Sequence, residues 1–369
     1  MRIAFIGQKG VPATFGGVEY HVEELAARLA AKGHDVTAYV RDWYTPREQL
    51  EYRGIKLKHA PTIQTKHLDA FIHSLTSSTH SISRRYDVVH YHAIGPCFFS
   101  WMPRISRLKT VATIHRFDYD AAKWSRNAQY FLKTCERIAL KVPHRTIVVA
   151  KHQKEYYKTN GYDVTYIPNG VLMPEPIEPQ EITSRYALRG GDYILFMGRL
   201  VPEKRVDWLI DSYLELEEHL EDIKLVIAGG SSATDGYVST LHQRARQNQN
   251  IVFTDYVTGR LKAELLSNTC LFVIPSALEG LPIALLEAMS YGSICLASDI
   301  PPHGEVITDS ENGFLFSNSR SDLAQSILRL TTLESPVLSG VGKSARQHMA
   351  RDYGWEDVVN KVEEIYRSV

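Results

Sequence analysis

The chain has few cysteines and no long apolar run. Four cysteines occur, Cys97, Cys135, Cys270 and Cys295, and none forms a C-x-x-C pair. This scatter indicates neither a disulfide framework nor a thiolate zinc site, so we expect the cysteines in the core. No stretch of eighteen apolar residues is present, and residues 1–7 lead into a glycine-rich loop rather than a cleavable apolar segment. We therefore expect a cytoplasmic protein without a membrane span.

The chain also lacks net charge, but its two halves are charged oppositely. Residues 1–175 carry 25 Lys and Arg against 15 Asp and Glu, whereas residues 176–369 carry 17 against 27. Such asymmetry can hold two halves together, or it can mark a basic half that meets an anionic partner such as a phospholipid surface or a pyrophosphate-bearing acceptor. Composition leaves both explanations open.

A third absence concerns the first glycine-rich loop. Residues 7–19, GQKGVPATFGGVE, do not have the G-x-G-x-x-G spacing that binds a dinucleotide pyrophosphate. This absence argues against a nicotinamide or flavin cofactor. Gly16 and Gly17 nevertheless precede a helical pattern, where free N–H groups suit a phosphate or a sugar hydroxyl. A plain flexible turn explains the same two glycines.

Strand and helix patterns alternate along the whole chain, which at 369 residues suits two domains. In the first half, apolar runs at 2–7, 34–40, 87–93, 110–115 and 145–150 predict strands, and 18–33 and 128–140 predict helices, the former ending at Gly33. A proline-rich stretch at 172–181 predicts a linker.

The second half repeats the alternation. Its predicted strands are 193–198, 223–230, 251–257, 271–276 and 294–299, and its predicted helices include 206–220 and the terminal 355–369. Alternation of this kind favours an α/β fold with two doubly wound Rossmann-like domains that face a cleft. We place the domains at residues 1–171 and 172–351.

The stretch PSALEGLPIALLEAMSYG, residues 275–292, contains two glutamates eight positions apart. Gly280 is a poor helix former and Pro282 suits the first helical position, so we expect a helix from about Pro282. Glu279 then lies in the preceding loop and Glu287 on the second turn. The free N–H groups at such a helix start attract phosphate, which predicts a ligand carrying both a phosphate and sugar hydroxyls.

Two cations stand where they can complete this site. Arg199 and Lys204 follow the predicted strand 193–198, at the edge where open α/β sheets bind ligands. Arginine and lysine can hold the oxygens of a diphosphate, although Lys204 and Arg205 could each be solvated surface charge. Glu287 could then accept hydrogen bonds from the hydroxyls of a ribose, and Glu279 from an attached sugar.

Histidines and aspartates in the first half offer other sites. His115 ends the predicted strand 110–115, which favours a place near a site. His90 and His92 lie two apart on one strand face as a possible metal pair, but no nearby carboxylate completes a ligand set, and we expect them partly buried. Asp118 and Asp120 could clamp a metal ion on a nucleotide diphosphate. The cations and amides already described leave such an ion little charge to neutralise, so we expect no metal.

Taken together, these stretches resemble the retaining family 4 glycosyltransferases of the GT-B fold. The resemblance runs along almost the whole chain through FGGVE, His115, IPNGV, GRLVPEKRVD, LVIAGG and the E-x7-E pair of residues 275–299. Three stretches resemble more narrowly the rhamnosyltransferase-like subgroup: residues 3–29, DVVHYHAIGP and KWSRNAQYFLKTCERIALK. The resemblance implies that the last helix, residues 352–369, packs back on the first domain.

The resemblance also implies roles for single residues. Gly16 and Gly17 would face the donor phosphates or the acceptor, and His115 would touch the donor sugar. Arg199 and Lys204 would hold the diphosphate. Glu279 would bind the transferred sugar together with the amides of Gly280 and Leu281, and Glu287 would bind the ribose. Two departures are Arg116 and Asp255, which stand where glycine is usual in the family.

The implied function is transfer of a sugar, rhamnose among the candidates, from a nucleoside-diphosphate sugar to an acceptor hydroxyl in polysaccharide or glycolipid synthesis. We expect the reaction to need no cofactor and no metal ion, and we expect no nucleic acid among the partners. The basic first half, with PRISRLK at 103–109, suggests a lipid-linked acceptor at the inner membrane face. The alternatives are a related epimerase or phosphorylase, and a non-catalytic sensor of nucleotide sugars.

Overall fold

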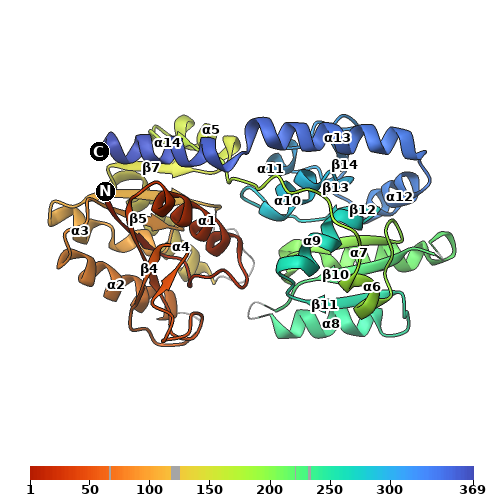
Figure 1. Ribbon diagram of the computed structural model, residues 1–369, viewed down its shortest axis with the longest axis horizontal. Coiled ribbons are helices and arrows are strands. Elements are labelled where there is room, and N and C mark those ends of the chain that lie inside the picture. The colour runs from red at the N-terminus through yellow and green to blue at the C-terminus, as the bar shows by residue number, and fades with distance from the viewer. Residues whose placement is uncertain (66–67, 118–124, 221, 232–233) are drawn as a thin grey trace. The chain divides into compact units, whose positions relative to one another are not determined.

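The computed structural model describes residues 1–65, 68–117, 125–220, 222–231 and 234–369 (Figure 1). The chain divides into two compact units, one formed by residues 1–170 with 355–369 and the other by residues 171–354. Both are built on a mainly parallel sheet, which confirms the predicted α/β fold.

The first unit contains an eight-stranded sheet in the order β3-β4-β2-β1-β5-β6-β7-β8, parallel except for the β3–β4 pair. Its strands are β1 (Arg2–Ile6), β2 (Asp35–Val40), β3 (Glu51–Tyr52), β4 (Ile55–His59), β5 (Val88–His92), β6 (Lys109–Ile114), β7 (Arg145–Val148) and β8 (Thr165–Tyr166). Its helices are α1 (Gly17–Ala31), α2 (Leu68–Ile82), the 3₁₀ helix η1 (Pro96–Phe99), α3 (Trp101–Ile105), α4 (Arg126–Lys141), α5 (Lys151–Thr159) and α14 (Trp355–Arg367).

Both faces of this sheet are buried, because apolar side chains of β1 alternate between two cores. Ile3 and Phe5 pack with residues of α1 and α14, while Ala4 and Ile6 pack with Cys135 of α4 on the opposite face. Near-continuous apolar strands are what a parallel sheet covered on both faces requires. Three of the four cysteines are buried, as the sequence predicted, whereas Cys270 is partly exposed; all four are free thiols.

Helix α14 packs beside α1 in the first unit (Figure 1). Trp355 and Val358 enter the core formed with Ile3 and Phe5. At Gly170 a Cβ atom would lie 2.4 Å from the Trp355 ring, so only glycine permits this close approach. The expected segment was residues 352–369; the helix itself begins at Trp355, and residues 352–354 belong to the second unit.

The second unit contains a six-stranded parallel sheet in the order β11-β10-β9-β12-β13-β14. Its strands are β9 (Tyr193–Met197), β10 (Lys224–Ala228), β11 (Ile251–Asp255), β12 (Leu271–Ile274), β13 (Cys295–Ser298) and β14 (Phe314–Phe316). Its helices are α6 (Glu181–Tyr186), η3 (Pro202–Lys204), α7 (Val206–Glu215), η4 (Glu217–His219), α8 (Asp235–Ala245), α9 (Gly259–Asn268), α10 (Ile283–Tyr291), α11 (Pro301–Gly304), α12 (Arg320–Thr331) and α13 (Ser335–Asp352).

Two predictions for this unit need correction. The expected single helix at 206–220 is divided into α7 and η4. The proline-rich segment expected as a linker is held against α9: the N–H of Ile177 donates to Ser267 Oγ at 3.1 Å, and the N–H of Gln180 donates to Glu264 Oε2 at 2.8 Å. Its backbone is therefore part of the second unit.

Candidate functional site

Two predicted donor residues of the second unit, and a third residue that was not predicted, follow adjacent strands of its sheet. Arg199 comes two residues after β9, Glu279 lies between β12 and α10, and His303 lies in α11 after β13. Since β9, β12 and β13 are neighbours in a parallel sheet, these segments all leave its carboxyl edge. This edge is where open α/β sheets bind ligands.

Lys204 and Glu279 contact each other directly. Lys204 Nζ forms an ion pair with Glu279 Oε1, and only 13% and 9% of the two side chains are exposed. A backbone hydrogen bond from the N–H of Ala277 to the carbonyl of Glu203, 2.8 Å, joins the two loops that carry them. The sequence predicted both residues at the site but not this pairing.

The environment of Glu279 favours its charged form. Burial opposes ionisation, but the charges of Lys204 and His303 and hydrogen bonds from Lys204 and Ser276 outweigh it, so the pKa of Glu279 is below its ordinary value. The carboxylate is therefore an ionised acceptor in the absence of a ligand.

His303 is a neighbour of Glu279 that the sequence reasoning missed. Its Nδ1 lies 2.7 Å from the carbonyl of Ser298, and the side chain is fully buried. Burial lowers the pKa of His303 to about 4, with Lys204 adding to the effect and Glu279 opposing it. The only sequence signal was its position just after a predicted strand.

Helix α10 begins at Ile283, with Pro282 as its N-cap residue. The helix was expected to start near Pro282, and the observed start is one residue later. Gly280 and Leu281 precede it, so their N–H groups belong to the helix entry. Glu279 lies in the loop and Glu287 on the second turn, as predicted.

Glu287 makes a separate ion pair. Lys262 Nζ in α9 lies 2.6 Å from Glu287 Oε1. The two acids of the E-x7-E pattern therefore each have a lysine of their own. Lys262 was not predicted, because nothing in the sequence pattern connects α9 with α10. Arg199 is half-buried and makes no ion pair with any residue that the structure describes.

In the first unit, the glycine-rich loop is tied down at several points. The N–H of Lys9 donates to Glu19 Oε1 at 3.1 Å, and the N–H of Thr14 donates to Tyr44 Oη at 2.8 Å. Gly16 has φ 102°, and a Cβ atom there would lie 1.9 Å from Glu19 Oε2. These contacts fix Gly16 as the N-cap residue of α1 and Gly17 as its first residue.

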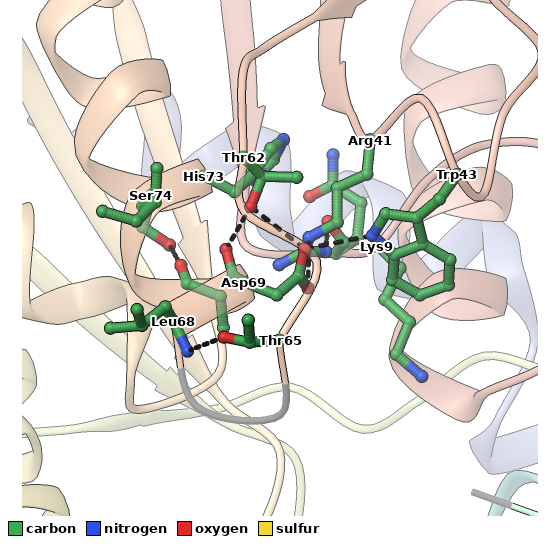
Figure 2. Close-up of polar contacts among 12 residues, drawn as sticks. Lys9, Arg41, Trp43, Thr62, Thr65, Leu68, Asp69, His73 and Ser74 are labelled. Carbon is green, nitrogen blue, oxygen red and sulfur yellow. Dashed lines mark hydrogen bonds and ion pairs between the residues drawn. The ribbon is translucent and has the colours of Figure 1, made fainter. Parts of the chain in front are cut away.

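A buried ion pair supports the start of this loop. Arg41 Nε lies 2.9 Å from Asp69 Oδ2, and Arg41 Nη1 donates to the carbonyl of Gln8 at 2.9 Å. Figure 2 shows Asp69 also accepting from Trp43 Nε1 at 3.0 Å and from Thr62 Oγ1 at 3.0 Å. Arg41 is only 2% exposed, so this cluster joins the carboxyl end of β2 to α2 and to the loop.

His115 lies among other histidines. His92 Nδ1 is 3.1 Å from His115 Nε2, and the His21 and His115 rings meet edge to face with centroids 5.0 Å apart. His90 and His92, expected to be partly buried, are fully buried because β5 is covered on both faces. His90 is held by Tyr366 Oη at 2.7 Å and Thr113 Oγ1 at 2.8 Å.

Burial keeps these histidines neutral. It lowers the pKa of His115 to about 3, with His90 adding to the effect, and it lowers the pKa values of His21 and His92 well below 6.5.

Asp118 and Asp120, the expected alternative metal clamp, lie outside the described residues. Asp255, at the departure from the family pattern, has φ 56°, in the region that glycine adopts without strain.

No helix among the described residues has both the length and the apolar character needed to cross a bilayer.

The chain matches two family models and many known proteins. Residues 15–172 match the model described as Glycosyltransferase Family 4, and residues 180–348 match that of Glycosyl transferases group 1. A phosphatidyl-myo-inositol mannosyltransferase of Mycobacterium leprae is 25% identical over 382 residues, covering 100% of this chain and 97% of that protein. An alpha-maltose-1-phosphate synthase of Mycolicibacterium smegmatis is 24% identical over 396 residues, covering 100% of this chain and 100% of that protein.

Solved structures share the fold at lower identity. A sucrose-phosphate synthase of Thermosynechococcus elongatus superposes with a TM-score of 0.86 at 18% identity, covering 100% of this chain and 98% of that chain. HepE of Anabaena in complex with UDP-glucose gives a TM-score of 0.83 at 17% identity, with both chains covered completely. The two family models divide nearly the whole chain between them, and its fold is GT-B: the chain belongs to the family 4 glycosyltransferases.

Proposed function

We propose that this glycosyltransferase moves a sugar from a nucleoside-diphosphate sugar to an acceptor hydroxyl, with retention of anomeric configuration. The observation that carries the proposal is the buried Lys204–Glu279 pair beside the start of α10, with Arg199 on the neighbouring loop. A cation, a carboxylate and the amide groups of a helix start at one sheet edge match the phosphates and hydroxyls of such a donor.

Each side chain has a part in this proposal. Arg199 and Lys204 bind the diphosphate, and the amides of Gly280 and Leu281 add donors at the helix start. Glu279 accepts hydrogen bonds from the transferred sugar, for which its ionised state is suited. Glu287 accepts hydrogen bonds from the ribose hydroxyls, while Lys262 remains paired with its Oε1. No divalent ion has a part in diphosphate binding.

The chemical step breaks the bond between the anomeric carbon and the diphosphate oxygen. In the proposed front-face substitution, the departing phosphate oxygen takes the proton of the acceptor hydroxyl while that hydroxyl's oxygen bonds to the anomeric carbon. Negative charge develops on the leaving diphosphate, so preorganised cations nearby lower the barrier. In the first unit, His115 is proposed to contact the donor sugar. Gly16 and Gly17 are proposed to face the donor phosphates or the acceptor.

The donor and the acceptor are proposed at the level of chemical class. The rhamnosyltransferase-like stretches favour a dTDP-linked deoxysugar, and the UDP-glucose bound by HepE of Anabaena makes UDP the other base to test first. The phosphatidyl-myo-inositol mannosyltransferase relative favours a lipid-linked or glycan acceptor. The product belongs to a cell-surface polysaccharide or glycolipid.

A basic and aromatic face in the first unit supports peripheral contact with an anionic membrane. Positions 126, 130, 133, 137 and 141 fall on one side of α4, and all five side chains, Arg126, Tyr130, Lys133, Arg137 and Lys141, are exposed. Phe131 on the same helix packs on Phe98 with ring centroids 5.4 Å apart, next to α3 with its exposed Trp101 and Ile105. Cations beside exposed aromatic rings are typical of a surface that binds at a lipid headgroup layer.

Vesicle pelleting tests the membrane proposal. The wild-type protein should sediment with vesicles containing phosphatidylserine and not with phosphatidylcholine alone, and Lys133→Glu with Arg137→Glu should abolish the difference. Lys361→Glu, on an exposed turn of α14, is the control for charge alone. Equal sedimentation with both vesicle types would contradict the proposal.

Product analysis tests transfer against its rivals. A transferase releases nucleoside diphosphate in step with a glycosylated acceptor, whereas an epimerase changes the donor sugar without releasing the nucleotide. A phosphorylase requires inorganic phosphate, and a sensor binds the nucleotide without turnover. The anomeric configuration of the product, read by proton NMR coupling constants, must match that of the donor for retention to hold.

A further inference from the structure

Three histidines from three separate segments converge in the first unit. His21 lies in α1, His92 is the last residue of β5, and His115 directly follows β6. One ring nitrogen from each can be chosen so that all three lie within 4.8 Å of one another. All three side chains are buried.

The spacing within this cluster approaches that of a metal site. Histidine nitrogens bound tetrahedrally to Zn²⁺ at about 2.0–2.1 Å lie roughly 3.3 Å from one another. His92 Nδ1 and His115 Nε2 are already 3.1 Å apart. The three chosen nitrogens lie within 4.8 Å of one another, so the cluster has to contract to hold an ion.

One polar atom of the cluster is unsatisfied. His92 Nε2 is buried and has no hydrogen-bond partner among the residues that the structure describes, while Nδ1 of the same ring lies beside His115. Unsatisfied buried nitrogens are rare in folded proteins and call for a ligand or another explanation. A neutral imidazole ring binds a metal ion through the nitrogen that carries a lone pair.

The surroundings define which histidines take part. The His90 ring is tilted against that of His92, with ring centroids 4.2 Å apart, but its two nitrogens already contact Tyr366 and Thr113. His90 is therefore part of the wall around the cluster. Three protein nitrogens leave one position of a tetrahedral ion open to water or to another ligand.

We propose that His21, His92 and His115 form a binding site for a divalent transition-metal ion such as Zn²⁺, and that the bound ion inhibits the enzyme. Inhibition follows because an ion on His115 removes the ring nitrogen that would contact the donor sugar. The metal site stands on the geometry of the cluster alone, whereas the inhibition rests on the proposed function. This ion is distinct from a catalytic cofactor, and the proposed transfer runs without it.

Cobalt titration tests the site without any need for turnover. Metal-stripped full-length protein is titrated with Co²⁺ in a buffer that does not bind metal, and the visible absorption of a tetrahedral Co²⁺ centre is followed. We expect saturation at one equivalent, loss of the absorption on adding Zn²⁺, and at least tenfold weaker binding in His92→Gln and in His21→Gln. His73→Gln, a buried histidine of the same unit outside the cluster, should bind as wild type does.

Two results would overturn the site: absence of saturable Co²⁺ absorption in the wild-type protein, or unchanged binding in both cluster variants. The wild-type titration decides the first even if a variant fails to fold. An activity assay tests the inhibition. Zn²⁺ at saturating concentration should suppress transfer at least tenfold, and a chelator should restore it. Co²⁺ binding with full activity in the presence of Zn²⁺ would retain the site and refute the inhibition.

Discussion

Lys204 Nζ and Glu279 Oε1 form an ion pair that is almost entirely removed from solvent, between a loop after β9 and the loop before α10. In the absence of a donor, each group serves as the counterion of the other. A diphosphate at this edge of the sheet would offer Lys204 a second anion, so donor binding and the ion pair are expected to be coupled.

Removal of Lys204 should slow the chemical step in addition to weakening diphosphate binding. Lys204→Ala is expected to lower kcat by about 10²–10³, the usual effect of losing one preorganised group that stabilises developing charge. Lys262→Ala, which breaks the pair with Glu287, should raise the KM for the donor and leave kcat close to that of the wild type. Steady-state kinetics of the two variants separate these roles, and near wild-type turnover of Lys204→Ala would remove Lys204 from the mechanism.

The pair should also be visible in stability. Lys204→Met leaves a buried carboxylate unpaired and is expected to destabilise the second unit by about 3 kcal/mol. Lys204→Met combined with Glu279→Gln should recover most of that loss, since no charge remains buried. Denaturant unfolding of the wild type, both single variants and the double variant gives the coupling free energy. Additive effects of the two changes would show that the residues do not interact.

Acid should destabilise the first unit through His73, a buried residue of α2. Burial lowers the pKa of His73 to about 3, with the charge of Arg41 adding to the effect and Asp42 and the carbonyl of Val40 opposing it. The folded state therefore binds fewer protons than the unfolded state, in which the pKa is about 6.5. The stability that results is complete above about pH 6.5 and is lost as the pH falls from there toward about 3.

The size of this effect is set by one proton. Between about pH 6 and pH 4 the slope of the unfolding free energy should decrease by up to about 1.4 kcal/mol per pH unit in His73→Gln relative to wild type. Urea unfolding at half-unit pH intervals measures both slopes. Identical slopes would mean that His73 is protonated in the folded protein at the same pH as in the unfolded chain.

Gly16 is expected to resist substitution more strongly than another glycine with positive φ. Both Gly16 and Gly33 have left-handed backbone, but a Cβ at Gly16 would collide with Glu19, whereas a Cβ at Gly33 would meet nothing within 4 Å. Gly33→Ala should cost about 1 kcal/mol from backbone strain alone, and Gly16→Ala about 2–3 kcal/mol or a displaced loop. Equal losses of thermal stability would contradict the expected collision with Glu19.

Periodicity and turn chemistry were enough to predict the fold and the place of the candidate donor residues. Apolar runs identified β1, β5, β6, β9, β12 and β13, and the Gly280–Pro282 step located the start of α10 to within one residue. Chain order then placed Arg199 and Glu279 at one sheet edge, because parallel strands share a direction.

Contacts between distant segments could not be predicted in the same way. Lys262 meets Glu287 only because α9 packs on α10, and His21 meets His92 and His115 only because β1, β5 and β6 are neighbours in the sheet. Helix α2 was missed because serines and threonines, weak helix formers, fill it; in the structure the Ser78 hydroxyl lies 2.8 Å from Tyr91 Oη. Tertiary packing supplies what local propensity lacks.

The most direct test of the central claim is calorimetric binding of UDP, dTDP and GDP to the purified protein in the presence of a chelator. We predict that one of the three binds at a single site without metal, and that Lys204→Ala weakens this binding at least tenfold. Binding that requires a divalent ion, or that is unchanged in Lys204→Ala, would contradict the site built from Arg199, Lys204 and Glu287.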